Sequence, residues 1–588
     1  MNFLKTFLAS CLGSLVALIA LVLLLIAVFS AAISNFSTDN TQAVVADNSV
    51  LHLKLNGQIT QIEVEDPFEG LPIPGADQPS IGLLQLKKAL AHAKSDDAIR
   101  GIYLNVSMFQ GGYAVAKEIR ESILDFRKSG KWVTAYSEMY SEASYYLASS
   151  ADKVFLNPEG EIEFNGLAVE VSFFKKMFDK LEIKPEIFRV GDFKSAVEPF
   201  FLDKMSDANR LQLKELIDEI NNTTLNEVAE SRKISLDQVK KISNQMLVTS
   251  PLDAKKYKLV DSLVYYDEVL SDLRAKLGLG KTEKIPFVKY HKYKKSFTAS
   301  TSSKNEIAVI VAEGDIIPGK AQEGMIGSDT FAEELRKART NDKVKAIVLR
   351  INSPGGSALA SDVMWREVRL ASKEKPIIAS MSNYAASGGY YLAMGCDTIV
   401  AEPNTITGSI GVFSVLFDLS SFLDKKIGIT FDEVKTGEAG NLVTFTRPLS
   451  EVEKAVWQKK TDKIYEGFTS KAADGRKMSV EKLRSVASGR VWSGTQAKEK
   501  GLVDVIGGFD DAVKIAAQSA GVGEDYKIKF YPKQKTFFAQ WLQGLEENAK
   551  VKMLKEELGD GYETLQQIKK LQHYQGAQAR MPFELQWK

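Results

Sequence analysis

Apolar and polar positions follow one another along this chain in a pattern typical of α/β proteins. Short apolar runs predict buried strands, and longer stretches with an apolar residue every three or four positions predict amphipathic helices. In the C-terminal half, the pattern predicts strands over Ile307–Ala312, Ala346–Ile351, Ile377–Met381 and Thr398–Ala401, and helices over Thr330–Thr340, Ala358–Ala371 and Ser387–Met394. Strands that alternate with helices form parallel sheets, which bind ligands at the carboxyl ends of their strands. We therefore expect an α/β fold with a site at that edge.

The same pattern occurs twice. The stretch Tyr145–Ala148 recurs as Tyr390–Ala393, at a spacing of 245 residues (390 − 145). Further on, Leu259–Asp261 recurs as Leu502–Asp504, at a spacing of 243 residues (502 − 259). Self-similarity held over such a distance indicates two copies of one fold.

These features divide the chain into five parts. We predict an N-terminal membrane anchor over residues 1–40, a first copy over 41–280, a linker over 281–304, a second copy over 305–532 and a tail over 533–588. The linker is basic at first and then rich in Ser and Thr, which favours a segment that crosses between domains.

The N-terminal segment Phe7–Ile33 has no charged residue. It is longer than the roughly 20 residues that a helix needs to cross a bilayer. A cleaved signal peptide has an apolar core of only about 7–15 residues, so we favour an uncleaved transmembrane helix. Cleavage after Ser30-Ala31-Ala32 is the alternative. Lys5 favours a cytoplasmic N-terminus, which places the rest of the chain on the outer side.

Composition narrows the classes of function. Of the 588 residues, 44% are apolar and 26% are charged, which excludes wholesale disorder. The net charge is +1, so nothing favours nucleic acid as a partner. The two cysteines, Cys11 and Cys396, lie far apart in the sequence, so neither a disulfide framework nor a cysteine-ligated metal is expected.

One serine stands out as a candidate nucleophile. Ser409 lies in the sequence Thr-Gly-Ser-Ile-Gly-Val, after an apolar run and a Pro-Asn turn. Flanking glycines permit a sharp turn that presents the hydroxyl beside backbone N–H groups. An ordinary tight turn gives the same pattern. The first copy has Phe164 at the corresponding position, so it lacks this hydroxyl.

Backbone N–H groups near this serine are candidates for an oxyanion hole. Gly355 and Gly356 follow a predicted strand in a Pro-Gly-Gly turn, which suits an anion, and Ile410 follows the serine itself. A plain strand-to-helix turn is the alternative. Ser387, in Ala-Ala-Ser-Gly-Gly, is a rival nucleophile or simply a small residue at a helix start.

A serine nucleophile needs a base, and no histidine lies between residues 305 and 530; the four are His52, His92, His291 and His573. Lys194 of the first copy lies among apolar residues in Phe-Lys-Ser-Ala-Val-Glu-Pro-Phe. A lysine has an ordinary pKa of about 10.4, and burial lowers that pKa and lets the amine act as a base. Lys435, closer in sequence to Ser409, is the second candidate. A salt-bridged surface lysine is the ordinary alternative for both.

Taken together, these motifs resemble the signal peptide peptidase A (protease IV) family in its long, two-copy form. The resemblance covers nearly the whole chain and is carried by residues 193–200, 352–357, 385–391 and 407–412. It implies tandem Clp/crotonase-like domains with an N-terminal transmembrane helix, and a serine peptidase with a Ser/Lys dyad. By motif, Ser409 is the nucleophile and Lys194 the base, and Thr436 falls where relatives have a serine that orients the lysine.

The resemblance also implies a setting. Members of that family are membrane-anchored homotetramers that degrade signal-peptide remnants at the outer face of the bacterial inner membrane, without a metal or cofactor. The related Clp proteases carry their serine in a motif similar to residues 385–389, which keeps Ser387 as the rival.

Two other functions remain open from the residues. A crotonase-like acyl-CoA enzyme could use the same fold and an oxyanion turn, but the motif at Gly355 and Gly356 shows no carboxylate pair. The other function is that of a membrane-tethered scaffold without catalysis. The first copy already lacks the serine, and the second copy could have lost its catalytic activity too. Site-specific acylation of a serine distinguishes the scaffold from an enzyme.

Overall fold

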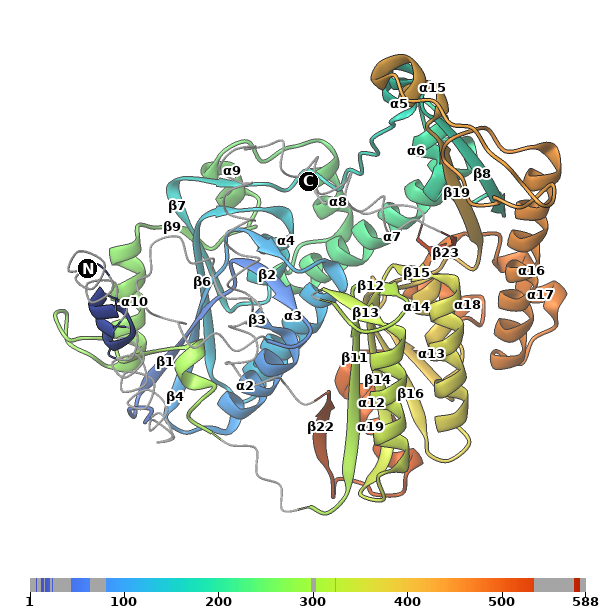
Figure 1. Ribbon diagram of the computed structural model, residues 1–588. Coiled ribbons are helices and arrows are strands. Elements are labelled where there is room, and N and C mark those ends of the chain that lie inside the picture. The colour runs from blue at the N-terminus through green and yellow to red at the C-terminus, as the bar shows by residue number, and fades with distance from the viewer. Residues whose placement is uncertain are drawn as a thin grey trace.

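The computed structural model describes residues 7, 12–14, 16–21, 24, 44–63, 81–297, 303–322, 324–532 and 576–581. They form two α/β halves that lie side by side, with a smaller lobe above the second half (Figure 1). Most of the predicted anchor, Phe7–Ile33, lies outside the described residues. In the part of the chain that the structure describes, no helix combines the length and apolar character needed to cross a membrane.

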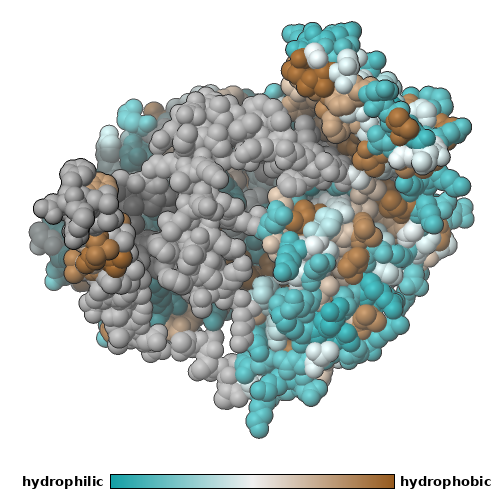
Figure 2. Space-filling view, in the orientation of Figure 1, coloured by the Kyte–Doolittle hydropathy of each residue, from teal (hydrophilic) through white to brown (hydrophobic). Residues whose placement is uncertain are grey.

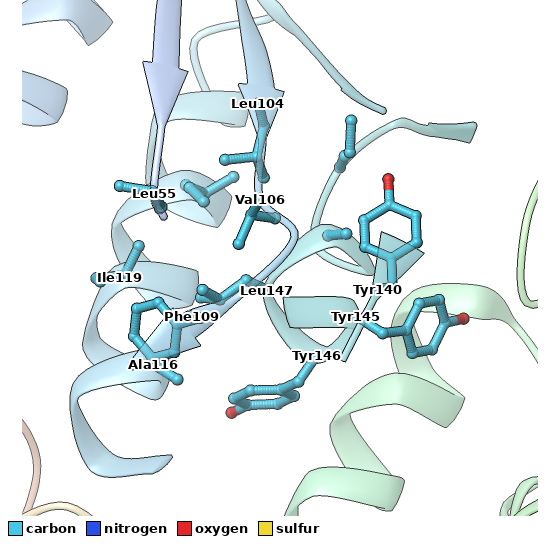
Figure 3. Packing of buried hydrophobic residues seen from close by; sticks show 14 of the residues in the cluster. Leu55, Leu104, Val106, Phe109, Ala116, Ile119, Tyr140, Tyr145, Tyr146 and Leu147 are labelled. Carbon is cyan, nitrogen blue, oxygen red and sulfur yellow. The ribbon is translucent and has the colours of Figure 1, made fainter. Parts of the chain in front are cut away.

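The first half is built on a parallel sheet with the strand order β10-β1-β4-β6-β7-β9. The strands are β1 (Ser49–Lys54), β4 (Ile99–Asn105), β6 (Trp132–Tyr140), β7 (Lys153–Ile162), β9 (Ser262–Leu263) and β10 (Phe287–Lys289). The main helices around it are α2 (Leu83–Ser95), α3 (Tyr113–Arg127), α4 (Glu142–Ala148), α7 (Asp207–Arg232) and α10 (Tyr266–Leu277). Figure 3 shows part of the core, where Leu104 and Val106 gather with Leu147 of α4 and Ile119 of α3.

The second half repeats this plan. Its sheet has the order β20-β18-β16-β14-β11-β22, and β17 and β21 extend it beside β16. The strands are β11 (Glu306–Glu313), β14 (Val344–Ser353), β16 (Ile377–Ala386), β17 (Thr398–Ala401), β18 (Ile406–Gly408), β20 (Val491–Ser493), β21 (Val505–Ile506) and β22 (Lys527–Tyr531). The helices include α12 (Ser328–Thr340), α13 (Ala358–Ala371), α14 (Gly388–Ala393), α16 (Glu451–Gly475) and α19 (Phe509–Ser519).

The predicted strands and helices of this half are thus confirmed, with shifted ends. β16 continues to Ala386 because its last residues pair with β18, which the apolar pattern alone does not reveal. In both copies a late strand returns to lie parallel to the first strand: β10 beside β1, and β22 beside β11.

This return corrects the predicted linker over 281–304. Its first part contains β10 and the short helix α11 (Tyr290–Tyr293), so it belongs to the first half. Two tyrosines of the basic run, Tyr290 and Tyr293, are buried and fix this segment to the first half. The lysines between and after them lie closer to solvent.

A third sheet joins the two copies. Its order is β13-β12-β15-β23-β19-β8. The strands are β8 (Lys184–Val190), β12 (Asp315–Ile317), β13 (Met325–Gly327), β15 (Gly355–Ser357), β19 (Val412–Asp418) and β23 (Ala577–Arg580). β8 comes from the first copy and pairs along its whole length, antiparallel, with β19 of the second. Side chains from both copies therefore meet along this sheet.

The lobe above the second half exposes apolar side chains. It contains α5 (Lys175–Leu181), α15 (Ser420–Phe422) and the loop that follows, and Figure 2 shows brown, apolar residues at its tip. The exposed apolar residues from these segments are Met177, Leu181, Ile427, Ile429, Phe431, Val434, Val443 and Phe445.

Candidate active site

Three predicted site residues meet at one point. The Lys194 amine lies 3.0 Å from the Ser409 hydroxyl oxygen, 2.8 Å from the Ser387 hydroxyl oxygen and 3.1 Å from the Ser409 carbonyl oxygen. All three residues are fully buried. The lysine of the first copy thus reaches the serines of the second within a single chain.

Strand pairing carries Lys194 to this position. β8 runs along β19, the chain turns at Gly191, and the Phe193 N–H donates to the carbonyl of Ser488, 3.1 Å away. Lys194 then caps a short 3-10 helix, Ser195–Val197. The turn lies over an apolar cluster to which both copies contribute, formed by Phe178, Ala196, Val197, Phe200, Phe413 and Val415.

Two glycines leave room for the lysine stem. A side-chain carbon on Gly489 would lie 2.6 Å from Lys194 Cβ, and one on Gly411 would lie 3.1 Å from Lys194 Cδ. Gly489 also has a φ of +78°, a conformation that favours glycine. Larger residues at these positions would push the amine away from the serines.

Burial decides the charge of the amine. It lowers the pKa of Lys194 well below its ordinary value, because the charged form loses its hydration in this site. The three oxygens that surround the amine belong to neutral groups. The arrangement therefore favours an uncharged amine with a lone pair.

Both serines have an unusual backbone conformation. Ser409 has a φ of 50° and Ser387 a φ of 54°, in the region that residues with side chains rarely adopt. The Ser409 N–H donates to the Arg490 carbonyl at 2.7 Å, and the Ser387 N–H donates to the Gly408 carbonyl at 2.8 Å. Such strain persists only where surrounding contacts hold it, and it is frequent at functional sites.

The two glycines of the predicted oxyanion turn lie between strands. A side-chain carbon on Gly355 would lie 2.1 Å from the Ala579 carbonyl oxygen, and one on Gly356 would lie 2.1 Å from the Ile316 carbonyl oxygen. The Gly355 N–H donates to Ser353 Oγ at 3.2 Å. Close approach of the neighbouring strands thus explains the pair of glycines, and their oxyanion role stays a prediction.

The first copy shows what the equivalent turn can bind. Glu142 occupies the position that corresponds to Ser387 at the spacing of 245 residues (387 − 142). Its carboxylate accepts from the N–H groups of Asn165, at 3.3 Å, and Gly166, at 3.0 Å. These two residues correspond to Ile410 and Gly411. Burial raises the pKa of Glu142 to about 7. The backbone N–H groups of this turn in the first copy can therefore bind a carboxylate oxygen.

Phe164 fills the place of the missing serine. It is buried and packs edge-on against Tyr145, with ring centres 5.4 Å apart. The first copy thus has an apolar core where the second has its hydroxyl.

Two lysine-related predictions differ from the structure. Lys435 is exposed, and its amine lies 3.2 Å from a carboxylate oxygen of Glu433 and 3.7 Å from one of the buried Glu453, whereas the amine that contacts the serines is that of Lys194. Thr436 is exposed in the same loop and is not among the contacts of the Lys194 amine, so the predicted orienting role of Thr436 is not supported. Ser387 supplies the second hydroxyl at the amine instead.

Sequence reasoning missed the residues that hold the lysine turn. Gln212 of α7 donates to the Phe193 carbonyl at 3.1 Å and to Ser195 Oγ at 2.8 Å, and accepts from the Val491 N–H at 3.3 Å. Ser195 Oγ also donates to Asn209, at 2.9 Å. No motif marks them, because α7 reads as an ordinary amphipathic helix.

Among the described residues, no group of His, Cys, Asp and Glu side chains is placed to hold a metal ion.

Known proteins resemble this chain over most of its length. A family profile described as Peptidase family S49 matches residues 125–280 and 369–523. The chain is 37% identical over 493 residues to a protein named Serine protease SPPA, chloroplastic, from Arabidopsis thaliana, which covers 82% of this chain and 71% of that protein. It is 38% identical over 464 residues to Protease 4 of Salmonella typhi, which covers 77% of this chain and 74% of that protein.

The two matched ranges fall on equivalent parts of the two copies, and together they cover more than half of the chain. The buried hydroxyls and amine lie in or beside these ranges. The chain therefore belongs to peptidase family S49 and is a serine peptidase.

Proposed function

We propose that Ser409 and Lys194 form the catalytic dyad of this peptidase. The observation that carries the proposal is the distance of 3.0 Å between a buried amine of lowered pKa and a hydroxyl on a strained turn. The amine takes the proton of Ser409 as the oxygen attacks a peptide carbonyl, and then gives that proton to the leaving amine. Water then gives a proton to the same amine as its oxygen attacks the acyl carbon, the bond from that carbon to the Ser409 oxygen breaks, and the amine returns the proton to the Ser409 oxygen.

The contacts of the amine favour Ser409 over Ser387 as the nucleophile. A neutral amine has two N–H donors and one lone pair. The Ser387 hydroxyl is 3.4 Å from the Gly411 carbonyl, to which it donates, so it accepts an N–H from the lysine. The Ser409 carbonyl accepts the other N–H. The lone pair is then left for the hydroxyl proton of Ser409, and Ser387 serves as a positioning residue.

Backbone N–H groups of Ile410 and Gly411 are the best-supported oxyanion donors. The equivalent N–H groups of the first copy bind the carboxylate of Glu142. An oxyanion donor contributes about 2.7–4 kcal/mol to transition-state stabilisation in comparable enzymes. Gly355 and Gly356 remain candidates.

The substrates that we propose are extended apolar peptides, including the remnants of cleaved signal peptides. The family resemblance supports this class, and so does the exposed apolar lobe at residues 427–445, since surfaces of this kind face apolar partners or a membrane. The same proposal includes a Clp/crotonase-like fold and an anchor at Phe7–Ile33. It also includes a homotetrameric assembly at the outer face of a bacterial inner membrane.

Substitution of the dyad tests this function. We expect Ser409→Ala and Lys194→Ala each to lower kcat/KM for a fluorogenic apolar peptide by about 10³-fold or more. Lys435→Ala is the matched control and should keep the wild-type rate, because Lys435 is exposed and its amine pairs with the carboxylates of Glu433 and Glu453.

Ser387→Ala separates the two serines. It should keep acylation of Ser409 by a fluorophosphonate, seen by mass spectrometry, while kcat falls through misplacement of the amine. Wild-type activity in Ser409→Ala, or acylation found on Ser387 alone, would refute the proposed dyad.

A further inference from the structure

A short loop, residues 488–490, contacts both of the turns that carry the proposed dyad. It directly precedes β20, and β20 pairs with β18, the strand that ends next to Ser409. The Ser488 carbonyl accepts the Phe193 N–H, at 3.1 Å, from the lysine turn, residues 191–195. We call this loop the bridge, because it joins a turn of the first copy to a turn of the second.

The bridge exchanges two backbone hydrogen bonds with the turn that carries Ser409. The Ser409 N–H donates to the Arg490 carbonyl at 2.7 Å, and the Gly489 N–H donates to the Ile410 carbonyl at 2.9 Å. A side-chain carbon on Gly411 would lie 2.7 Å from Gly489 Cα. The two main chains are therefore in direct contact, with no room for a side chain between them.

These bonds set the direction of the proposed oxyanion donors. In a trans peptide, the C=O and the N–H of one unit point in opposite directions. The Ser409 carbonyl accepts from the Lys194 amine, and the Ile410 carbonyl accepts from the bridge. The N–H groups of Ile410 and Gly411 therefore point away from the amine and the bridge. Neither N–H has a hydrogen-bond partner among the described residues, so both are open to an oxyanion.

The Arg490 side chain fastens the bridge to the lysine turn. Its guanidinium carbon lies 4.9 Å from the centre of the Phe193 ring and 4.2 Å from the centre of the Trp492 ring. The guanidinium also forms an ion pair with Glu215 of α7. Phe193 directly precedes Lys194, so a cation stacked on the Phe193 ring restrains the residue that carries the amine.

The backbone of the bridge is strained. Ser488 has a φ of 54° and Gly489 a φ of 78°, two successive residues in the left-handed region. A residue with a side chain rarely adopts this conformation, and surrounding contacts must hold it there. A side-chain carbon on Gly191 would lie 2.4 Å from the Ser488 carbonyl oxygen, so the lysine turn lies directly against the strained residue.

We infer that the bridge positions both parts of the proposed reaction, with Arg490 as its main positioning residue. The bridge holds the Lys194 amine and the open N–H groups in fixed places around the Ser409 hydroxyl. Arg490 acts through Phe193 and through the Ser409 main chain, and not on the substrate. The inference rests on the proposed function, since Arg490 has this role only where Ser409 is the nucleophile and Lys194 its base.

Replacement of Arg490 tests the inference. We expect Arg490→Met to lower kcat for an apolar peptide about 10- to 100-fold, because a displacement of about 1 Å costs that much in comparable enzymes. KM should change little, since the loss falls on the transition state. The pH at which activity is half-maximal should move, because a looser lysine turn admits water to the amine. Arg490→Lys keeps a cation beside the two rings and should recover part of kcat.

Lys500→Met is the matched control. The Lys500 amine lies over the same Trp492 ring, 4.3 Å from its centre, whereas the cation on the Phe193 ring is that of Arg490. This variant should keep the wild-type kcat and pH profile. If Arg490→Met loses stability but keeps the kcat and pH profile of its control, Arg490 has only a structural role and the inference is wrong.

A second pair of variants tests the backbone of the bridge. Ser488→Val places a β-branched residue in the left-handed region, where such residues are genuine outliers, and should lower kcat as Arg490→Met does. Lys477→Val is its control, because Lys477 has a φ of 52° and is exposed just after α16. It should lose stability but keep kcat. A kcat that stays at the wild-type value in Ser488→Val contradicts the inference.

Acylation by a small fluorophosphonate separates this inference from the proposed function. If Ser409 of the wild-type chain is not acylated, the proposed function fails and the inference fails with it. If Ser409 is acylated and the bridge variants cleave peptide like their controls, the inference alone fails. Slower acylation of Ser409 in Arg490→Met than in Lys500→Met supports the inference, since the reagent reacts with the hydroxyl that Lys194 activates.

Discussion

At the scale of single residues, the site depends on one amine kept out of water. Lys194 is fully buried among oxygens of Ser387 and Ser409, and its pKa is lowered by loss of hydration. The unfolded chain has no such burial, so its lysine binds a proton up to about pH 10.4. Between the lowered pKa of the folded state and that value, the unfolded state holds more protons than the folded one.

This difference predicts a pH-dependent effect on stability. The folded state gains stability relative to the unfolded state as pH rises through this window, since the unfolded state binds the extra proton. Lys194→Met keeps the length of the stem and removes the titrating group. We expect it to raise the melting temperature at neutral pH, and the gain to shrink as pH approaches about 10.4. Thermal unfolding followed by circular dichroism from pH 6 to pH 10 measures the melting temperatures of the variant and the wild type. A gain in melting temperature that does not depend on pH contradicts a buried, neutral amine.

At the scale of elements, one turn and one helix hold the lysine in place. The turn after β8 contacts the chain of the second copy at Ser488, and Gln212 of α7 ties that turn to β20. The geometry of the proposed dyad is therefore set in part by a helix that contributes no reacting group.

We predict that Gln212→Ala lowers kcat about 10- to 100-fold, because a displacement of about 1 Å costs that much in comparable enzymes. KM should change little. The pH at which activity is half-maximal should also move, because a looser turn lets water reach the Lys194 amine. Gln238→Ala is the matched control on the neighbouring helix α8 (Leu236–Asn244). A variant that loses stability without any shift of the pH profile would mean that Gln212 has only a structural role.

Much of this arrangement was predictable from sequence. The spacing of 245 residues revealed the duplication, apolar runs located the strands of the second copy, and the glycine-flanked serine and the apolar-flanked lysine marked the groups that meet. The strand pairing of β8 with β19, the position of β23 and the support from Gln212 were not predictable. The two strand pairings, and the hydrogen bond from Val491 to Gln212, join residues more than a hundred positions apart, and local periodicity carries no information about them. Lys435 and Thr436 lie closer to Ser409 in sequence, yet the lysine that contacts Ser409 is Lys194, and the second hydroxyl at its amine is that of Ser387.

At the scale of the whole molecule, the two copies share a buried network of charges. Arg350 of the second copy and Glu118 of the first form an ion pair, and both side chains are fully buried. Arg350 also donates to Gln61 at 2.7 Å, and Lys87 lies 2.8 Å from Glu118. The pKa of Glu118 is lowered to about 2: burial opposes this shift, and the charges of Arg350 and Lys87 outweigh it.

We predict that Glu118→Ala destabilises the protein by about 3–5 kcal/mol, because it leaves a buried guanidinium without its partner. Asp218→Ala, which breaks the exposed pair with Lys214, should cost only about 0.3–0.5 kcal/mol. Urea unfolding of both variants measures the difference. Similar midpoints in the two variants would show that the network does not hold the copies together.

The proposed dyad draws its amine from one copy and its hydroxyl from the other, and this has a consequence for synthesis. A ribosome makes Lys194 long before it makes Ser409, so a growing chain carries a base with nothing to activate. Cleavage becomes feasible only after the second copy has emerged and docked on the first. Division of the enzyme between its copies thus delays its appearance as a protease until the polypeptide is nearly complete.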